Sequence, residues 1–235
     1  MTNEQAEPFK YLTSGIDTLE VSFYLRRHMS ENRFPDFTTL AAMKEEIRAQ
    51  KNRKGGKVIQ FGDQEFLLRG HGTNTGFPFF MENEHFKIGF GEFNKPNFSV
   101  KFSCEDLWHK GWRGPVEGFV DLVISAGFAP YQSEIISRVD FAFDYMIPHV
   151  DFDEDSFYTL AINDGRIRKR GKTQTMRFGS DDVVLRVYNK SDEINEKSGK
   201  TWFYPIWGGI SDNVWRIEWQ FRGTRLREIG TPHSA

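Results

Sequence analysis

Charged and large apolar side chains alternate in two distant segments of the chain, RVDFAFD at 138–144 and RIEWQFR at 216–222. Because successive side chains of a strand point to opposite faces, this period of two predicts strands with Arg and an acid on one face. The segments share Arg, an aliphatic residue, an acid, an aromatic residue and Phe at matching offsets. This similarity has two alternative explanations. Either the two segments belong to related halves of one fold, or they are alike by chance in a Phe-rich chain.

The remaining patterns predict an α+β fold, a mostly antiparallel sheet with helices packed on one face. Aromatic residues make up 15% of the chain, which favours strands. Strands are expected at 16–24, 58–61, 66–69, 85–91, 97–103, 134–145, 173–178, 183–188 and 214–222. Helices are expected at 36–50, 116–126 and 153–162 and from about 224, with loops at 70–80 and 165–172. We expect residues 1–14 to be a flexible leader and 15–235 a single domain.

Composition excludes several classes of protein. The 235 residues include 31 basic and 33 acidic side chains, for a net charge of −2. The single cysteine, Cys104, rules out an internal disulfide framework and fits a cytoplasmic protein. No apolar run approaches the length of a membrane span, so we expect no membrane partner. The six histidines form no pair at i, i+2 or i, i+4, and Walker and GxSxG motifs are absent.

The segment VVLRVYNK places Arg186, Tyr188 and Lys190 on one side of a predicted strand. Positive neighbours favour the phenolate, so they are expected to lower the pKa of Tyr188 and make it a better nucleophile. The same cations would hold a phosphate. The alternative is a half-buried strand tyrosine with solvated neighbours, and the spacing alone does not exclude it.

Asp140 and Glu218 are candidate metal ligands because each lies mid-strand among apolar neighbours. An unpaired carboxylate there is unfavourable, so each needs a cation. Asp144 shares a face with Asp140, about 13 Å away along the strand. Oxygen ligands of this kind suit Mg²⁺ or Mn²⁺. Alternatively, Arg138 and Arg216 pair with the two acids across neighbouring strands.

Two basic clusters stand out against the acidic whole. One, at 51–57, has four cations in seven residues. The other has five cations in seven residues: Arg166, Arg168, Lys169, Arg170 and Lys172. Such clusters are either an electrostatic footprint for DNA phosphates or solvated loops.

Four segments in order, GIDTLEVSF, SRVDFAFDY, TMRFGSDDVVLRVYNKSDE and VWRIEWQFRGTRLRE, give the chain a family resemblance over roughly residues 15 to 230. It resembles the rolling-circle replication initiators of plasmids and phages, which are related to relaxases and HUH-type tyrosine endonucleases. The resemblance implies an HUH-like architecture and a site-specific, metal-dependent enzyme that nicks and transfers a DNA strand. Members often continue into further helices, so a C-terminal extension absent from this chain is an open alternative.

The resemblance also implies roles for individual residues. Tyr188 corresponds to the nucleophile, whose attack leaves a 5′-phosphotyrosine and a free 3′-OH. Asp140 and Glu218, with Asp144, become the expected ligands of Mg²⁺ or Mn²⁺, since the His-hydrophobic-His triplet of better-known relatives is absent. Arg186 and Lys190 become candidates for phosphate contact or for tuning Tyr188. Arg138 and Arg216 join the five cations of 166–172 as candidate DNA-binding residues.

The implied partner is origin DNA, single-stranded or in a hairpin, with host helicase and polymerase and a homodimer as further candidates. A non-catalytic origin-binding module of the same fold is one alternative function. An aromatic-rich β-protein that binds a carbohydrate or a protein through Trp202, Trp207 and Trp215 is another.

Overall fold

The computed structural model describes residues 9–28, 34–50, 55–148, 159, 161, 163–169 and 172–229. The chain divides into two compact units. Thr18–Val139 with Leu226–Ala235 form one, which we call the phenylalanine unit, and Met1–Asp17 with Asp140–Arg225 form the other, the tyrosine unit. The assignment of one catalytic domain to 15–235 stays a prediction.

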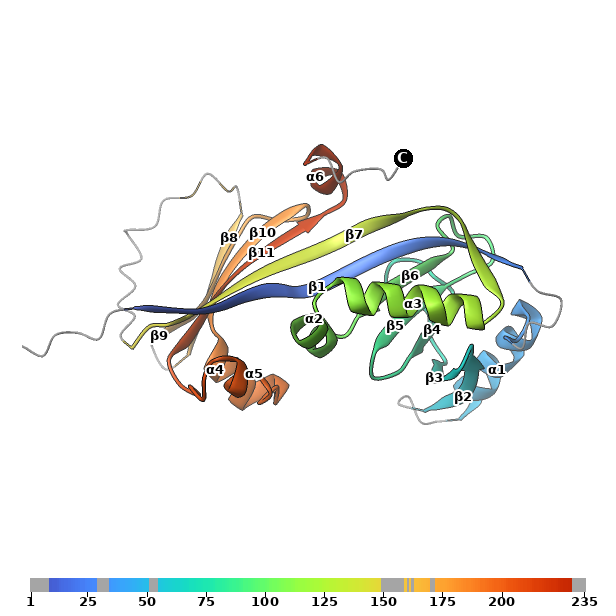
Figure 1. Cartoon of the computed structure of the whole chain (residues 1–235), viewed down its shortest axis with the longest axis horizontal. Coiled ribbons are helices and arrows are strands. Elements are labelled where there is room, and N and C mark those ends of the chain that lie inside the picture. The colour runs from blue at the N-terminus through green and yellow to red at the C-terminus, as the bar shows by residue number, and fades with distance from the viewer. Residues whose placement is uncertain are drawn as a thin grey trace, which may run out of the picture. The chain divides into compact units, whose positions relative to one another are not determined.

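The described residues form eleven strands (Figure 1). They are β1 (Lys10–Arg27), β2 (Gly56–Phe61), β3 (Gln64–Arg69), β4 (Phe79–Glu82), β5 (Phe86–Phe90), β6 (Phe98–Phe102), β7 (Phe128–Met146), β8 (Asp164–Lys169), β9 (Lys172–Phe178), β10 (Val183–Asn189) and β11 (Val214–Arg222). Their hydrogen-bonded order is β2-β3-β4-β5-β6-β1-β7-β11-β10-β9-β8. Pairs such as β1–β6, β5–β6, β9–β10 and β10–β11 are antiparallel, which confirms the predicted α+β fold.

The helical elements within the described residues are mostly short (Figure 1). They are α1 (Phe37–Ala49), α2 (Cys104–Lys110), α3 (Arg113–Ser125), α4 (Lys190–Glu193), the π-helical turn η2 (Ile194–Ser198), α5 (Phe203–Ile206) and α6 (Gly223–Glu228). None of the described helices combines the length and apolar character that crossing a membrane requires.

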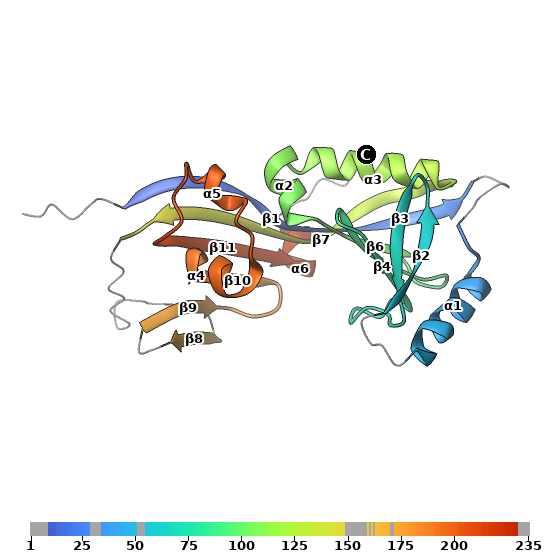
Figure 2. The same ribbon diagram turned by 90° about the horizontal axis from the view of Figure 1, so that it is seen from below.

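Phenylalanine rings build the core of the phenylalanine unit. Phe86, Ile88 and Phe90 stand at every second position of β5, so they share one face of the strand. All three are buried. Phe119 of α3 packs against Phe86 with ring centroids 5.6 Å apart, and Phe37 of α1 lies 6.4 Å from Phe90. Both helices therefore cover the same face of the sheet in this unit, as predicted (Figure 2).

Two segments differ from the sequence prediction, and a third is not tested. β1 begins at Lys10, so residues 10–14 extend the strand rather than belonging to a leader. The expected basic loop at 165–172 is a hairpin of β8 and β9, in which Arg168 pairs with Thr173. β8 is the last strand in the order, and charged residues are common on such an edge because they discourage pairing with another chain. The helix predicted at 153–162 lies outside the described residues, apart from 159 and 161.

Candidate active site

One face of the tyrosine unit's sheet carries a cluster of buried charged residues. In the β10–β11 register, Tyr188 lies opposite Arg216 and Arg186 lies opposite Glu218. Neighbouring β7 contributes Asp140 to this cluster. Asp140, Arg216 and Glu218 are at most 3% exposed, so their charges must be satisfied mainly by other side chains of the protein. Figure 2 shows β1, β7, β11 and β10 beside one another in this unit.

Arg216 is the most enclosed residue of the cluster. Its Nε and Nη2 donate to the two carboxylate oxygens of Asp144 at 2.6 and 2.8 Å, and its Nη1 pairs with Asp17. Its guanidinium also lies 4.6 Å from the ring centroid of Phe203 in α5. Trp207 donates from Nε1 to Asp144 at 2.9 Å. Burial opposes the charge of Arg216, but its hydrogen bonds to Asp144 and the negative charges of Asp144 and Asp17 together hold its pKa well above the ordinary value.

These contacts correct two predictions. Asp144 was expected among the metal ligands, but both of its oxygens accept hydrogen bonds from Arg216 and one also accepts from Trp207. Arg216 was expected to contact DNA, but its side chain has no exposed surface. The pair lies beside Tyr188 on the same face of the sheet, and in this arrangement its polar atoms are engaged with each other, with Asp17 and with Trp207.

Tyr188 is half-buried, and its hydroxyl donates to Oε2 of Glu218 at 2.9 Å. Burial raises the pKa of Tyr188 well above its ordinary value; the charge of Arg216 acts in the opposite direction, and Glu218 and Asp17 add to the increase. The prediction that flanking cations lower this pKa is therefore wrong. The sequence showed the nearby cations, but not the acids that face the same hydroxyl.

Arg186 lies among oxygen acceptors. Its Nη2 is 2.7 Å from Oε1 of Gln220, 3.2 Å from Oε1 of Glu218 and 3.4 Å from Oδ2 of Asp140. Its Nε is buried and has no hydrogen-bond partner among the described residues. Asp140 and Glu218, the acids at matching positions of the two similar segments, thus both lie beside Arg186. Arg138, the other expected partner and a candidate DNA contact, lies 3.6 Å from Glu20 in the phenylalanine unit.

Lys190 begins α4 directly after β10 and is only 2% exposed. Its Nζ pairs with Oε2 of Glu193 at 2.6 Å and lies 5.8 Å from the ring centroid of Tyr188. It lies 5.2 Å from the centroid of Phe203, which also contacts Arg216. Burial lowers the pKa of Lys190. The structure therefore brings Arg186, Tyr188 and Lys190 together, as the strand spacing predicts.

Asp140 and Glu218 fit a divalent cation in one respect and not in another. Within the described part of the chain, no three His, Cys, Asp or Glu side chains gather to form a metal cage. Mg²⁺, however, is commonly held by one or two carboxylates, with water and substrate phosphate completing its shell. Burial raises the pKa of Glu218, and the nearby carboxylates of Asp17 and Asp140 raise it further. This excess of acid favours a cation beside Asp140 and Glu218.

Sequence reasoning missed Asp17 and Gln220. Gln220 stands two positions after Glu218, so the alternation of the strand already places both on one face. Asp17 lies in the first predicted strand, but only its contact with Arg216, 199 positions along the chain, assigns it to this site.

The basic residues of 166–172 are only partly described. Arg166 and Arg168 are exposed on β8. Arg170, and the side chains of Lys169 and Lys172, lie outside the described part of the chain. The contact of this cluster with DNA stays a prediction.

Of the three tryptophans proposed for a carbohydrate- or protein-binding surface, Trp207 and Trp215 are buried and Trp202 is half-buried. Trp207 and Trp215 are 3% and 7% exposed, and Trp202 stacks on Phe203 with centroids 3.9 Å apart. Aromatic rings are exposed instead at Phe141 and Trp219, on the opposite face of the tyrosine unit.

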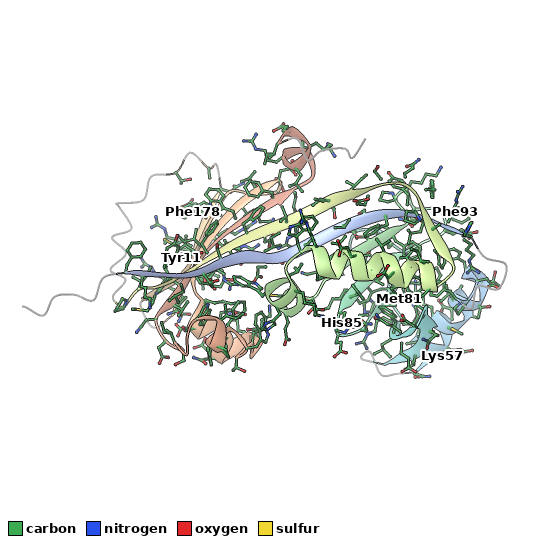
Figure 3. The ribbon with its side chains drawn as sticks, viewed as in Figure 1. Tyr11, Lys57, Met81, His85, Phe93 and Phe178 are labelled. Atoms are coloured by element: carbon green, nitrogen blue, oxygen red, sulfur yellow. The ribbon has the colours of Figure 1, made fainter. Side chains whose placement is uncertain are left out.

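Among the histidines that the structure describes, none belongs to a metal ligand set. His85 of the phenylalanine unit, labelled in Figure 3, lies with Nδ1 2.7 Å from Oδ2 of Asp106. Asp106 in turn pairs with Lys110 at 2.6 Å, so this group is an ion-pair cluster at the start of α2.

The chain is similar to the solved structure of the rolling circle replication initiator protein from Geobacillus stearothermophilus. The TM-score is 0.51 at 17% sequence identity, and the match covers 94% of this chain and 77% of that chain. No protein-family model matches, and no curated protein matches by sequence. At this identity the likeness shows a shared fold, and it agrees with the family resemblance seen in the four sequence segments.

Proposed function

We propose that this protein is a tyrosine-dependent DNA-nicking and strand-transfer enzyme that initiates rolling-circle replication, or conjugative transfer, at a specific origin. One observation carries the proposal: on a fold shared with a replication initiator, the hydroxyl of Tyr188 donates to Glu218 beside Arg186 and Asp140. The proposal is supported because a tyrosine hydroxyl, a carboxylate that accepts its hydrogen bond and an arginine lie in one cluster, the groups that such a reaction needs.

The reaction follows from these groups. The oxygen of Tyr188 attacks the scissile phosphorus, the bond from phosphorus to the 3′ oxygen breaks, and a 5′-phosphotyrosine forms. Glu218 is placed to accept the tyrosine proton at Oε2, and the departing 3′ oxygen takes a proton from solvent. Arg186 offers a guanidinium that offsets negative charge on the phosphate. Attack of a 3′-OH on the phosphotyrosine reverses these steps and closes a strand.

Divalent-metal dependence belongs to the same proposal. Asp140 and Oε1 of Glu218, the oxygens that face Arg186, would hold Mg²⁺ or Mn²⁺, which would act as a Lewis acid on the scissile phosphate. Because Arg186 is 30% exposed, its side chain has room to turn toward a bound phosphate and leave the carboxylates to the ion.

The test is a covalent adduct on a denaturing gel. Wild-type protein, Tyr188→Phe and the matched control Tyr204→Phe are mixed with Mn²⁺ and DNA flanking the protein's own gene, supercoiled and single-stranded. Tyr204 also donates a hydrogen bond from its hydroxyl, to Asn195 at 2.8 Å. We expect an adduct from wild type and from Tyr204→Phe, and none from Tyr188→Phe, although that variant still binds DNA. An adduct with Tyr188→Phe would reject Tyr188 as the nucleophile.

A non-catalytic origin-binding module is the second candidate. It is favoured by the raised pKa of Tyr188, since burial and Glu218 keep the hydroxyl protonated in the absence of substrate. Binding of the same DNA without an adduct from wild type would support it. Host helicase, host polymerase and homodimerisation remain predictions under either candidate.

A further inference from the structure

Arg177 lies on the same sheet face as Tyr188, one strand closer to the edge. In the β9–β10 register Arg177 is opposite Arg186, and Thr175 is opposite Tyr188. Side chains of directly paired residues point to the same face. Phe178, the next residue, is labelled in Figure 3 and is buried on the other side of β9. Arg177 therefore stands beside the candidate active site, with its side chain exposed.

Nothing in the described part of the chain neutralises Arg177. None of the described residues forms a hydrogen bond or an ion pair with its guanidinium. On the far side of β9 it lies opposite Gly165, where an added Cβ would meet no atom within 4 Å. Within the described part of the chain, no atom fills the position of a side chain at Gly165, beside Arg177.

Arg177 and Arg186 together need an anion. Like charges directly opposite each other on neighbouring strands repel. Arg186 directs Nη2 toward the acids, but its buried Nε lacks a partner among the described residues. A phosphate above this face of β9 and β10, between the side chains of Arg177 and Arg186, would offset the repulsion between them. It would accept charge-assisted hydrogen bonds from both guanidinium groups.

We infer that Arg177, with the guanidinium of Arg186 beside it, holds a backbone phosphate of the DNA strand that enters the Tyr188 site. This inference rests on the proposed function for the identity of the ligand. Neighbouring strands lie about 4.8 Å apart, so a phosphate at this pair is within one or two strand spacings of Tyr188. Arg166 and Arg168 on β8 extend the exposed basic surface to the sheet edge.

The test measures the salt dependence of DNA binding. The full-length chain is titrated with a fluorescein-labelled oligothymidylate in EDTA at a series of NaCl concentrations, for wild type, Arg177→Gln, Arg177→Lys and Arg113→Gln. Arg113 is an exposed arginine of α3 in the phenylalanine unit, so its variant has the same change in net charge. Each phosphate contact on a single strand contributes about 0.7 to the slope of log affinity against log salt.

We expect the slope of Arg177→Gln to be less steep by about 0.7, with Arg177→Lys and Arg113→Gln close to wild type. Equal slopes in Arg177→Gln and Arg113→Gln would overturn the inference, as would an equal loss in Arg177→Lys or no binding by wild type. The covalent-adduct assay separates the two claims. An adduct with unchanged slopes rejects the Arg177 site alone, whereas a reduced slope without any adduct rejects the nicking function alone.

Discussion

At the scale of single residues, the surroundings of Glu218 disfavour its ionised form. Burial raises its pKa above the ordinary value of 4.5, and Asp17 and Asp140 add to the increase, while Arg186 and the Tyr188 hydroxyl act in the opposite direction. At pH values between 4.5 and the raised pKa, Glu218 binds a larger fraction of a proton in the folded state than in the unfolded state. The free energy of unfolding must therefore fall as pH rises through that window.

This sign gives the first prediction. Glu218→Gln keeps an oxygen acceptor for Tyr188 but cannot titrate, so its stability relative to wild type should increase as pH rises from the ordinary pKa of 4.5 into the neutral range. Urea denaturation of both proteins across that range measures the difference. Parallel stability profiles would contradict the raised pKa. The variant should also lose adduct formation, because it lacks the proton acceptor.

The two aspartates of β7 should respond differently to the same change. Asp144→Asn leaves buried Arg216 without its main charge partner, and loss of one partner of a buried pair destabilises a protein by about 3–5 kcal/mol. Since Asp17 remains, the lower end of that range is expected. Asp140→Asn affects the partly exposed Arg186, which keeps Gln220 and Glu218, so its stability should change less while nicking is lost.

Chemical denaturation combined with the adduct assay checks this contrast. Equal losses of stability, or full activity of Asp140→Asn, would remove Asp140 from the proposed metal and phosphate site.

At the scale of elements, side-chain contacts to β7, β9 and β11 hold the segment of α4, η2 and α5 on the sheet. Trp207, directly after α5, reaches Asp144 of β7 through its indole nitrogen. Trp207→Phe keeps an aromatic ring near Phe203 but removes this donor. A hydrogen bond to a charged group contributes about 1.5–3 kcal/mol, so the free energy of unfolding should decrease by that order.

Trp112→Phe is the matched control, since Trp112 is 48% exposed in the other unit. If both substitutions change stability equally in urea denaturation, the hydrogen bond to Asp144 is not what holds the segment.

Elements with strong local signals were predictable, and those held by distant contacts were not. The segment at 36–50 has helix formers after Asp36, and the structure has α1 at Phe37–Ala49 with the Asp36 side chain accepting from Thr39 at 2.7 Å. In contrast, α4 and α5 have four residues each, too few for a helical period. Their stability comes from Phe203 and Trp207 packing on Arg216 and Asp144.

Prediction of the candidate active site from the sequence was limited in the same way. Alternation correctly placed Arg186 and Tyr188 on one face, because a period of two needs only local sequence. The partners were not predictable, since they depend on strand order: β11 lies between β7 and β10 and brings Glu218 to Tyr188. Arg216 was predicted to bind DNA and Asp144 to bind a metal ion, but they form a buried ion pair with each other. In a sequence, residues of a buried ion pair and residues of a binding site look alike.

At the scale of the whole molecule, two strands belong to both compact units. β1 runs without interruption from Lys10 to Arg27 and β7 from Phe128 to Met146, while the boundary between the units falls after Asp17 and after Val139. Each unit therefore contains only part of β1 and part of β7. This continuity predicts one cooperative unfolding transition for the chain.

Phe119→Ala tests the prediction from the phenylalanine unit. Phe119 is fully buried against Phe23 and Phe86, and truncation of a buried phenylalanine destabilises by about 3–5 kcal/mol. Scanning calorimetry should show a single peak whose calorimetric and van't Hoff enthalpies agree, shifted to lower temperature by Phe119→Ala and also by Trp207→Phe. Two peaks, of which each substitution moves only one, would show that the units unfold independently despite sharing their longest strands.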